Sequence, residues 1–510
     1  MLHFKSRQGS AQSNRALTSI GTLVLFLFTV SCGKGQAQQL EADPYAQYLT
    51  QLYESNTQSA QQQFSKLLAD YNGDSSDVDR PAVQYYRNGG QWLWMGTPEQ
   101  LAKADTLFTT MQAQVDSMGF SRDYFLLSEI QPLLEQMHQP DSVENLPETM
   151  AQLEYKLSKA YTRYALGQRF GFTNPVKLFG KNNYDTQIEK ADSAFFNQLF
   201  SPAADAQAVA DLLASVEPHD SAYQLFKKKL ATDTTDAQRF LTLCNMERRR
   251  WRNVKQPEAQ PRYIFVNIAA QEVWAIGGDT VNNMRVCCGK ASTKSPLLTS
   301  EINKIEFNPE WGIPQSIIRG EVSGHAGDPS YFSRRNYYIT NSSGQKVDPS
   351  TLTPGDLASG RYAVRQRSGA GNALGRIIFR FPNRFSVYLH HTSSPGAFNK
   401  AQRTVSHGCI RLQRPFEIAE FVLEGEDEWK IDQMRLSIDM EPKTEQGKEY
   451  KRTHRGAIRL VSSTPVEPVM PVVIDYYTLF PNPKTGDMET WGDPYGYDKI
   501  IQKAIKPFLP

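Results

Sequence analysis

The hydrophobic pattern of the chain changes from a helical to a strand-like period near residue 253. From Tyr45 to Asn253 apolar residues recur at steps of three and four, as on one face of a helix. From Tyr263 onward they form short runs rich in β-branched and aromatic residues, bounded by turn residues. A length of 510 residues allows two or three domains. The pattern therefore predicts an α+β chain: a helical domain at 46–253, a mostly-β domain at 262–470, and a C-terminal strand and helix at 471–510.

The helical half shows helix ends as well as periodicity. Apolar residues from Met150 to Tyr164 recur at three- and four-residue steps, Pro147 suits a first helical turn, and Gly171 marks the end. A second helix is expected at 206–216, before Pro218. No residue cluster here indicates chemistry, so we interpret this half as a scaffold.

The strand-like half is interrupted. Strands are expected at 263–268, 272–276, 284–288, 362–366 and 376–380, with a helix at 415–423. Residues 315–360 instead contain many Gly, Ser, Asn and Asp residues without a strand rhythm. An irregular segment of this length inside a compact domain is usually a lid or a binding loop. The sequence therefore predicts a long lid insertion at about 315–360.

One cysteine lies in a distinctive setting. Cys409 follows Ser406-His407-Gly408, and the apolar run before it ends in His390-His391. A free thiol has a pKa of roughly 8.5, so it needs a base to react near neutral pH. A His on a neighbouring strand is the usual base. The arrangement predicts a cysteine nucleophile at Cys409 with His390 as general base.

The other cysteines and the charge exclude several classes of protein. The chain has five cysteines, and Cys244, Cys287 and Cys288 are expected to pack in the interior. The paired spacing of zinc ligands is missing, so we predict no metal and no cofactor. The net charge is +2, without a basic block, which argues against a nucleic-acid partner.

The N-terminus has the pattern of an export signal. Basic residues precede an apolar stretch at 16–30 that is too short for a transmembrane helix and typical of a secretory signal. Small residues then lead to Cys32, as in bacterial lipoprotein signals; ordinary cleavage near Ala37 is the alternative. We therefore predict a signal peptide at 1–31, lipidation of Cys32, and a flexible Gln/Ala/Gly-rich tether at 33–45.

An ordered set of motifs resembles the L,D-transpeptidases, the YkuD-like cysteine enzymes of the bacterial cell wall, in their longer YcbB-like periplasmic form. The family pattern is a His at a strand end followed by Ser/Thr-His-Gly-Cys-x-Arg/Asn, which His390 and residues 406–411 match. Further matches lie at 212–218, 307–314, 365–375, 381–383 and 388–390. Two features depart from the longer form: the peptidoglycan-binding module is missing between the two halves, and His391 replaces a frequent Asp.

The resemblance implies acyl transfer on wall peptides. Cys409 would attack a tetrapeptide stem and release D-Ala, His390 would act as base, and His391 would orient it through its backbone. An imidazolium would lower the thiol pKa, and the backbone N–H groups of Gly408 and Cys409 would bind the oxyanion. Further substrate-binding residues would be Ser406, His407, Arg411, Tyr388, Asn372 and Trp311. The implied partners are peptidoglycan stem peptides and carbapenem-type inhibitors, and the implied location is the periplasm, with a lipid anchor as the only membrane contact.

Several alternatives stay open at this point. Cys409 could be a buried structural thiol, His407 could be the base, Arg411 could be a solvated charge, and Tyr388 and Trp311 could be core residues. The function could be an L,D-transpeptidase that makes 3→3 cross-links or exchanges D-amino acids. It could also be an L,D-carboxypeptidase that uses water as acceptor, or a non-catalytic wall-binding scaffold.

Overall fold

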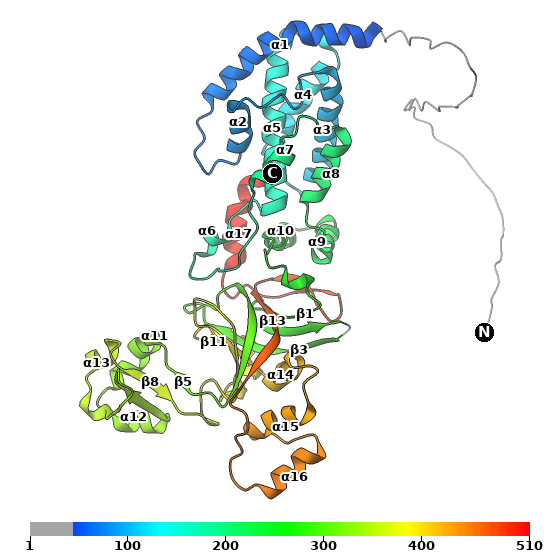
Figure 1. Cartoon of the computed structure of the whole chain (residues 1–510). Coiled ribbons are helices and arrows are strands. Elements are labelled where there is room, and N and C mark those ends of the chain that lie inside the picture. The colour runs from blue at the N-terminus through cyan, green and yellow to red at the C-terminus, as the bar shows by residue number, and fades with distance from the viewer. Residues whose placement is uncertain (1–43, 279) are drawn as a thin grey trace, which may run out of the picture. The chain divides into compact units, whose positions relative to one another are not determined.

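The computed structural model describes residues 44–278 and 280–510, and residues 50–510 form one compact unit (Figure 1). The predicted signal peptide and Cys32 lie outside the described residues. Helix α1 (Pro44–Asp70) already includes the last two residues of the predicted tether. Within the described ranges, every helix is either too short or too polar to cross a membrane.

The first half of the chain is helical, as predicted. The long helix α5 (Leu146–Phe170) packs against α2, α3, α4, α8 and α10, and its bounds confirm the helix predicted from Pro147 and Gly171. Its Asn145 side chain accepts a hydrogen bond from the Glu148 N–H and so caps the first turn. The other helices are α2 (Arg80–Arg87), α3 (Pro98–Met118), α4 (Leu127–Met137), α6 (Pro175–Phe179), α7 (Ser193–Leu199), α8 (Ala206–Val216), α9 (Ser221–Thr232) and α10 (Asp236–Arg250).

A buried carboxylate on α5 organises the irregular segment between α2 and α3. Glu154 is 0% exposed and accepts hydrogen bonds from the backbone N–H groups of Leu93 (2.6 Å), Trp94 (3.0 Å) and Met95 (2.9 Å), and from the Tyr86 hydroxyl. Burial raises the pKa of Glu154, and these four donors oppose the rise. A segment without helix or strand has no partners of its own for its N–H groups, and Glu154 supplies them.

We expect Glu154→Ala to lower the free energy of unfolding by about 3–5 kcal/mol, because it leaves three buried N–H groups without their acceptor. Urea unfolding followed by circular dichroism measures the change. Glu129→Ala is the matched control, since that carboxylate is half exposed and pairs with Lys156 at the surface; it should cost less than about 1 kcal/mol. A similar loss in both variants would contradict the role of Glu154.

The second half is built on a sheet that closes on itself. Among the described residues, nine strands follow the order β11-β3-β12-β10-β9-β4-β13-β1-β2, and β3 pairs with β12 along one part and with β2 along another. The strands are β1 (Arg262–Asn267), β2 (Glu272–Gly277), β3 (Thr280–Gly289), β4 (Leu298–Phe307), β9 (Ile377–Arg380), β10 (Leu389–His390), β11 (Thr404–Ser406), β12 (Ile410–Leu412) and β13 (Ser463–Asp475). Helices α14 (Pro415–Val422), α15 (Glu428–Ser437) and α16 (Glu445–Thr453) follow β12.

The predicted boundary at residue 470 falls inside a strand. β13 runs from Ser463 to Asp475 and lies between β4 and β1 in the main sheet, so it belongs to the β domain. A small pair of strands, β14 (Leu479–Pro481) and β15 (Met488–Thr490), and helix α17 (Tyr497–Ile505) complete the chain. Helix α17 packs against α6 and α10 of the helical half (Figure 1), and the Ser121 N–H donates to the Phe508 carbonyl at 2.8 Å.

The insertion is folded rather than irregular. Together with the two strands that flank it, it forms a second sheet of order β5-β8-β6-β7, made of β5 (Trp311–Gly312), β6 (Tyr337–Thr340), β7 (Lys346–Val347) and β8 (Ala363–Gln366). Short helices α11 (Gln315–Ile317), α12 (Pro329–Arg334) and α13 (Pro354–Ala358) pack with it. Its buried side chains form a core separate from the main one. The expectation of an irregular segment was therefore wrong, because such short elements leave little periodicity; its action as a lid stays a prediction.

Candidate active site

Two short parallel strands carry the predicted residues. In β10 and β12, Leu389 pairs with Ile410 and His390 with Arg411, and the Ile410 N–H donates to the Tyr388 carbonyl at 3.0 Å. Leu389 and Ile410 are completely buried in the main core. Since side chains alternate along a strand, the neighbouring positions point to the opposite face of the sheet. The same alternation, extended by the one residue before each strand, assigns Tyr388, His390, Cys409 and Arg411 to that face.

Cys409 differs from the other described thiols. Cys244, Cys287 and Cys288 are buried, as predicted, whereas Cys409 is partly exposed. Its Sγ lies 3.9 Å from the Ser386 carbonyl, to which it donates. Burial around the sulfur raises the pKa of the Cys409 thiol, while the Tyr388 backbone and the charge of Arg411 oppose the rise. The predicted lowering of the thiol pKa by an imidazolium is therefore not found.

His390 is set to be neutral. His390 is only 3% exposed. Burial, together with the charge of Arg411, lowers the pKa of His390 to about 4, and hydrogen bonds with the backbone of His391 and Leu374 oppose this shift. Among the described residues, its Nδ1 makes no hydrogen bond of ordinary geometry. A neutral imidazole can accept a proton, so the resting site combines a neutral thiol with a neutral base.

His391 turns its ring toward a different partner. The Arg376 N–H donates to its Nδ1 at 3.2 Å, and the His391 N–H donates to the Ile377 carbonyl at 2.9 Å. Gly375, with φ of 65°, makes this approach possible, because a Cβ there would lie 2.6 Å from the His391 Cβ. These contacts hold the ring of His391, and its orienting role toward His390 stays a prediction.

The Cys409 loop, residues 406–409, is held by its own serine. Ser406 Oγ accepts from the Gly408 N–H at 3.1 Å and donates to the Cys409 carbonyl at 2.6 Å. Gly408 has a φ of 121°, a backbone conformation that strongly favours glycine. Of the two N–H groups predicted to bind an oxyanion, that of Gly408 is already used by Ser406. The Cys409 N–H has no acceptor among the described residues.

Further anchors of the site were missed from the sequence. Ser295 Oγ donates to the Gly408 carbonyl at 2.6 Å, although 113 positions separate the two residues, and no sequence pattern indicates this contact. Asn383 Oδ1 accepts from the Phe385 and Val387 N–H groups, and so shapes the turn that presents the Ser386 carbonyl to Cys409. The Phe-Pro-Asn motif at 381–383 was a signal that could have pointed to Asn383.

The insertion contacts the Cys409 loop. His407 is exposed, and its Nε2 lies 2.6 Å from a carboxylate oxygen of Glu321, in a π-helical turn at Ile318–Val322. Single π turns occur often at functional sites. The Glu321 carboxylate engages one His407 nitrogen and leaves the other able to accept a proton. His390 as the base therefore stays a prediction.

Of the predicted substrate residues, Arg411 is positively charged and Tyr388 lies beside a second arginine. The charge of Arg411 acts on both His390 and Cys409, and its buried Nε has no partner among the described residues. The Arg380 guanidinium lies 4.5 Å from the centre of the Tyr388 ring. Arg380 is paired with Glu306 at 3.0 Å, so the unpaired charge beside the thiol is that of Arg411, which suits an anionic ligand.

Asn372 and Trp311 lie outside the strands β10 and β12 and the loops that precede them. Asn372 is 1% exposed; its Nδ2 donates to the carbonyls of Pro309, Gln366 and Arg367, and its Oδ1 accepts from Leu374. Trp311 pairs with Gln366 in the second sheet and packs against the core of the insertion. Both residues hold the junction of the insertion with the main sheet, and their contact with substrate stays a prediction.

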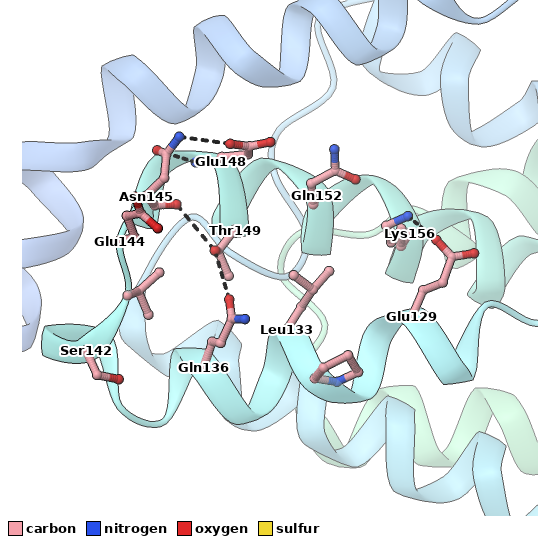
Figure 2. A pocket seen from close by; sticks show the side chains of 12 residues that line it. Glu129, Leu133, Gln136, Ser142, Glu144, Asn145, Glu148, Thr149, Gln152 and Lys156 are labelled. Carbon is pink, nitrogen blue, oxygen red and sulfur yellow. Dashed lines mark hydrogen bonds and ion pairs between the residues drawn. The ribbon is translucent and has the colours of Figure 1, made fainter.

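A separate cavity of about 630 Å³ lies between α4 and α5 (Figure 2). Polar side chains such as Gln136, Glu148 and Gln152 line it, and Lys156 pairs with Glu129 at its edge. None of the predicted site residues lines this cavity. The described residues also contain no group of three or more His, Cys, Asp or Glu side chains arranged to hold a metal ion.

Comparisons with known proteins agree with this division of the chain. A family described as the L,D-transpeptidase catalytic domain, YkuD, matches residues 261–431, and a family described as the Scaffold domain matches residues 81–230. A protein of Haemophilus influenzae named "Putative L,D-transpeptidase" is 28% identical over 244 residues. That similarity spans 47% of this chain and 45% of the relative, less than half of its length.

Proposed function

Because the chain combines a YkuD-family L,D-transpeptidase catalytic domain with a Scaffold domain, we propose that it transfers acyl groups between peptidoglycan stem peptides through a thioester on Cys409. The observation that carries this proposal is the pairing of β10 with β12. Cys409 and Tyr388 directly precede the paired residues Ile410 and Leu389, so the same register extended by one residue puts Cys409 one diagonal step from His390, on the same face of the sheet. Strands lie about 4.8 Å apart and rise about 3.3 Å per residue, so residues one diagonal step apart are about 8 Å apart at the backbone, within reach of a histidine and a cysteine side chain.

In the first step Cys409 Sγ attacks the carbonyl carbon of the third stem residue. The thiol proton passes to His390, which is neutral above about pH 4. The tetrahedral oxyanion then accepts a hydrogen bond from the Cys409 N–H, which has no acceptor among the described residues. Collapse breaks the C–N bond to the terminal D-Ala, whose amine takes the proton from His390. A thioester remains on Cys409.

In the second step an amine of another stem attacks the thioester carbonyl and gives its proton to His390. The C–S bond breaks, the sulfur recovers the proton, and a 3→3 cross-link or an exchanged D-amino acid results. The stem peptide carries carboxylates, and the charge of Arg411 beside Cys409 favours such a substrate.

The test is to incubate the purified protein with tetrapeptide muropeptides and to analyse the products by mass spectrometry. We expect D-Ala release together with dimers joined between third residues. Tripeptides without dimers would identify a carboxypeptidase, because water then resolves the thioester. No D-Ala release and no adduct at Cys409 with a carbapenem would favour a non-catalytic scaffold.

The proposed substrate places the protein outside the cytoplasm, in the cell envelope. The predicted lipidation of Cys32 would attach it to a membrane at the N-terminus. Carbapenems are the proposed inhibitors, because they acylate a reactive thiol and leave a covalent mass on it.

A further inference from the structure

Two residues far from Cys409 in the sequence hold the carbonyl that precedes it. Ser295 is 0% exposed; its Oγ donates to the Gly408 carbonyl at 2.6 Å and accepts from the Gly289 N–H at 2.9 Å. Tyr495, from the C-terminal segment, donates to the Gly289 carbonyl at 2.7 Å and accepts from the Ser295 N–H at 3.1 Å. The hydroxyl of Tyr495 therefore fixes both the loop after β3 and the serine that binds Gly408.

This contact determines where the Cys409 N–H points. The peptide bond between Gly408 and Cys409 is planar, and in its trans form the C=O and N–H point in opposite directions. A hydrogen bond that fixes the Gly408 carbonyl therefore also fixes the Cys409 N–H, which is directed away from Ser295. Glycine at 408 makes the constraint necessary, since its backbone has more freedom than that of any other residue.

Tyr495 is itself held by the helical half. Its N–H donates to the Tyr476 hydroxyl at 3.0 Å, and that hydroxyl donates to Asp493 at 2.5 Å. Asp493 also accepts from the Asp498 N–H, and the Asp498 carboxylate lies 2.6 Å from Arg248 in α10. Charge-assisted hydrogen bonds of this kind are the strong ones, and Arg248 is almost fully buried.

We propose that Tyr495 and Ser295 are positioning residues that aim the Cys409 N–H at the oxyanion of the acyl-transfer reaction. The C-terminal segment thereby links the helical half to the geometry of the thiol loop. The inference rests on the proposed function, since an oxyanion arises only if Cys409 attacks a carbonyl.

The test compares two reactions of the same thiol in the full-length protein. Acylation by a carbapenem passes through an oxyanion, whereas alkylation by iodoacetamide is a displacement at carbon without one. Tyr495→Phe should slow acylation about tenfold and Ser295→Ala about a hundredfold, with alkylation and its pH profile unchanged. Tyr497→Phe is the matched control: its buried hydroxyl has no partner among the described residues, so both rates should stay at the wild-type value.

Equal losses of acylation and alkylation rate would overturn the inference, because they would indicate altered thiol ionisation or folding. Acylation at the wild-type rate in both Tyr495→Phe and Ser295→Ala would also overturn it. Thermal melting of each variant identifies unfolding. Failure of the proposed function has a different signature: the wild-type protein would be alkylated at Cys409 but not acylated.

Discussion

Cys409→Ala should abolish both D-Ala release from tetrapeptide muropeptides and the carbapenem adduct, a loss of at least about 10⁴-fold in turnover. The reason is chemical: no other described thiol is exposed, and without sulfur no thioester can form. Removing the nucleophile of an enzyme that acts through a covalent intermediate typically leaves only the small contribution of binding and oxyanion stabilisation. Intact-protein mass spectrometry and chromatography of D-Ala measure the two losses.

Cys287→Ala is the control for a thiol on the same sheet face. Cys287 pairs with Arg411 across β3 and β12 but is completely buried, and burial raises its pKa. We expect this variant to keep its adduct and its activity within about threefold. An adduct that persists in Cys409→Ala and disappears in Cys287→Ala would show that Cys287, and not Cys409, is the reactive thiol.

His390→Asn should lower kcat/KM for acylation by about 10²–10⁴-fold, the usual contribution of a general base. His407→Asn tests the rival base and should cost less than about tenfold if His390 takes the thiol proton, because His407 would then serve only to hold the loop through Glu321. The comparison of the two variants in one assay identifies the base. A larger loss in His407→Asn than in His390→Asn would overturn the assignment.

The pH profile gives a second check on His390. Its pKa is lowered to about 4, and the base works only when neutral. Activity should therefore be retained as the pH falls from 7 to 5 and be lost as it falls through about 4. Arg411→Gln removes a charge that disfavours the imidazolium, so the acid limb should move up toward 6.5. An acid limb near 6.5 in the wild-type protein would contradict the burial of His390.

The helices of the first half and several strands of the second could be predicted from the sequence. Helix α5 satisfies every local rule at once: a cap at Asn145, Pro147 in the first turn, and regular apolar spacing. Strand β13 does not, since Pro465, Pro468 and Pro471 interrupt its pattern and the register shifts between Pro465 and Met470. Its central place in the sheet follows from tertiary pairing, which short-range patterns do not contain.

The candidate site divides in the same way. Cys409 and His390 stand in local motifs, so the sequence pointed to them directly. Ser295 and Tyr495 are 200 positions apart, and only folding brings them together. The directions of the pKa shifts were also beyond the sequence, because they depend on how much water each group loses.

The insertion shares no buried side chain with the main core. Substitutions there can reshape the rim of the site without loosening the strands that carry the sulfur and the imidazole. Under the proposed function, selection could therefore change the incoming amine while it preserved the attack on the donor, and related proteins could diverge in the cross-links they make before they diverge in mechanism.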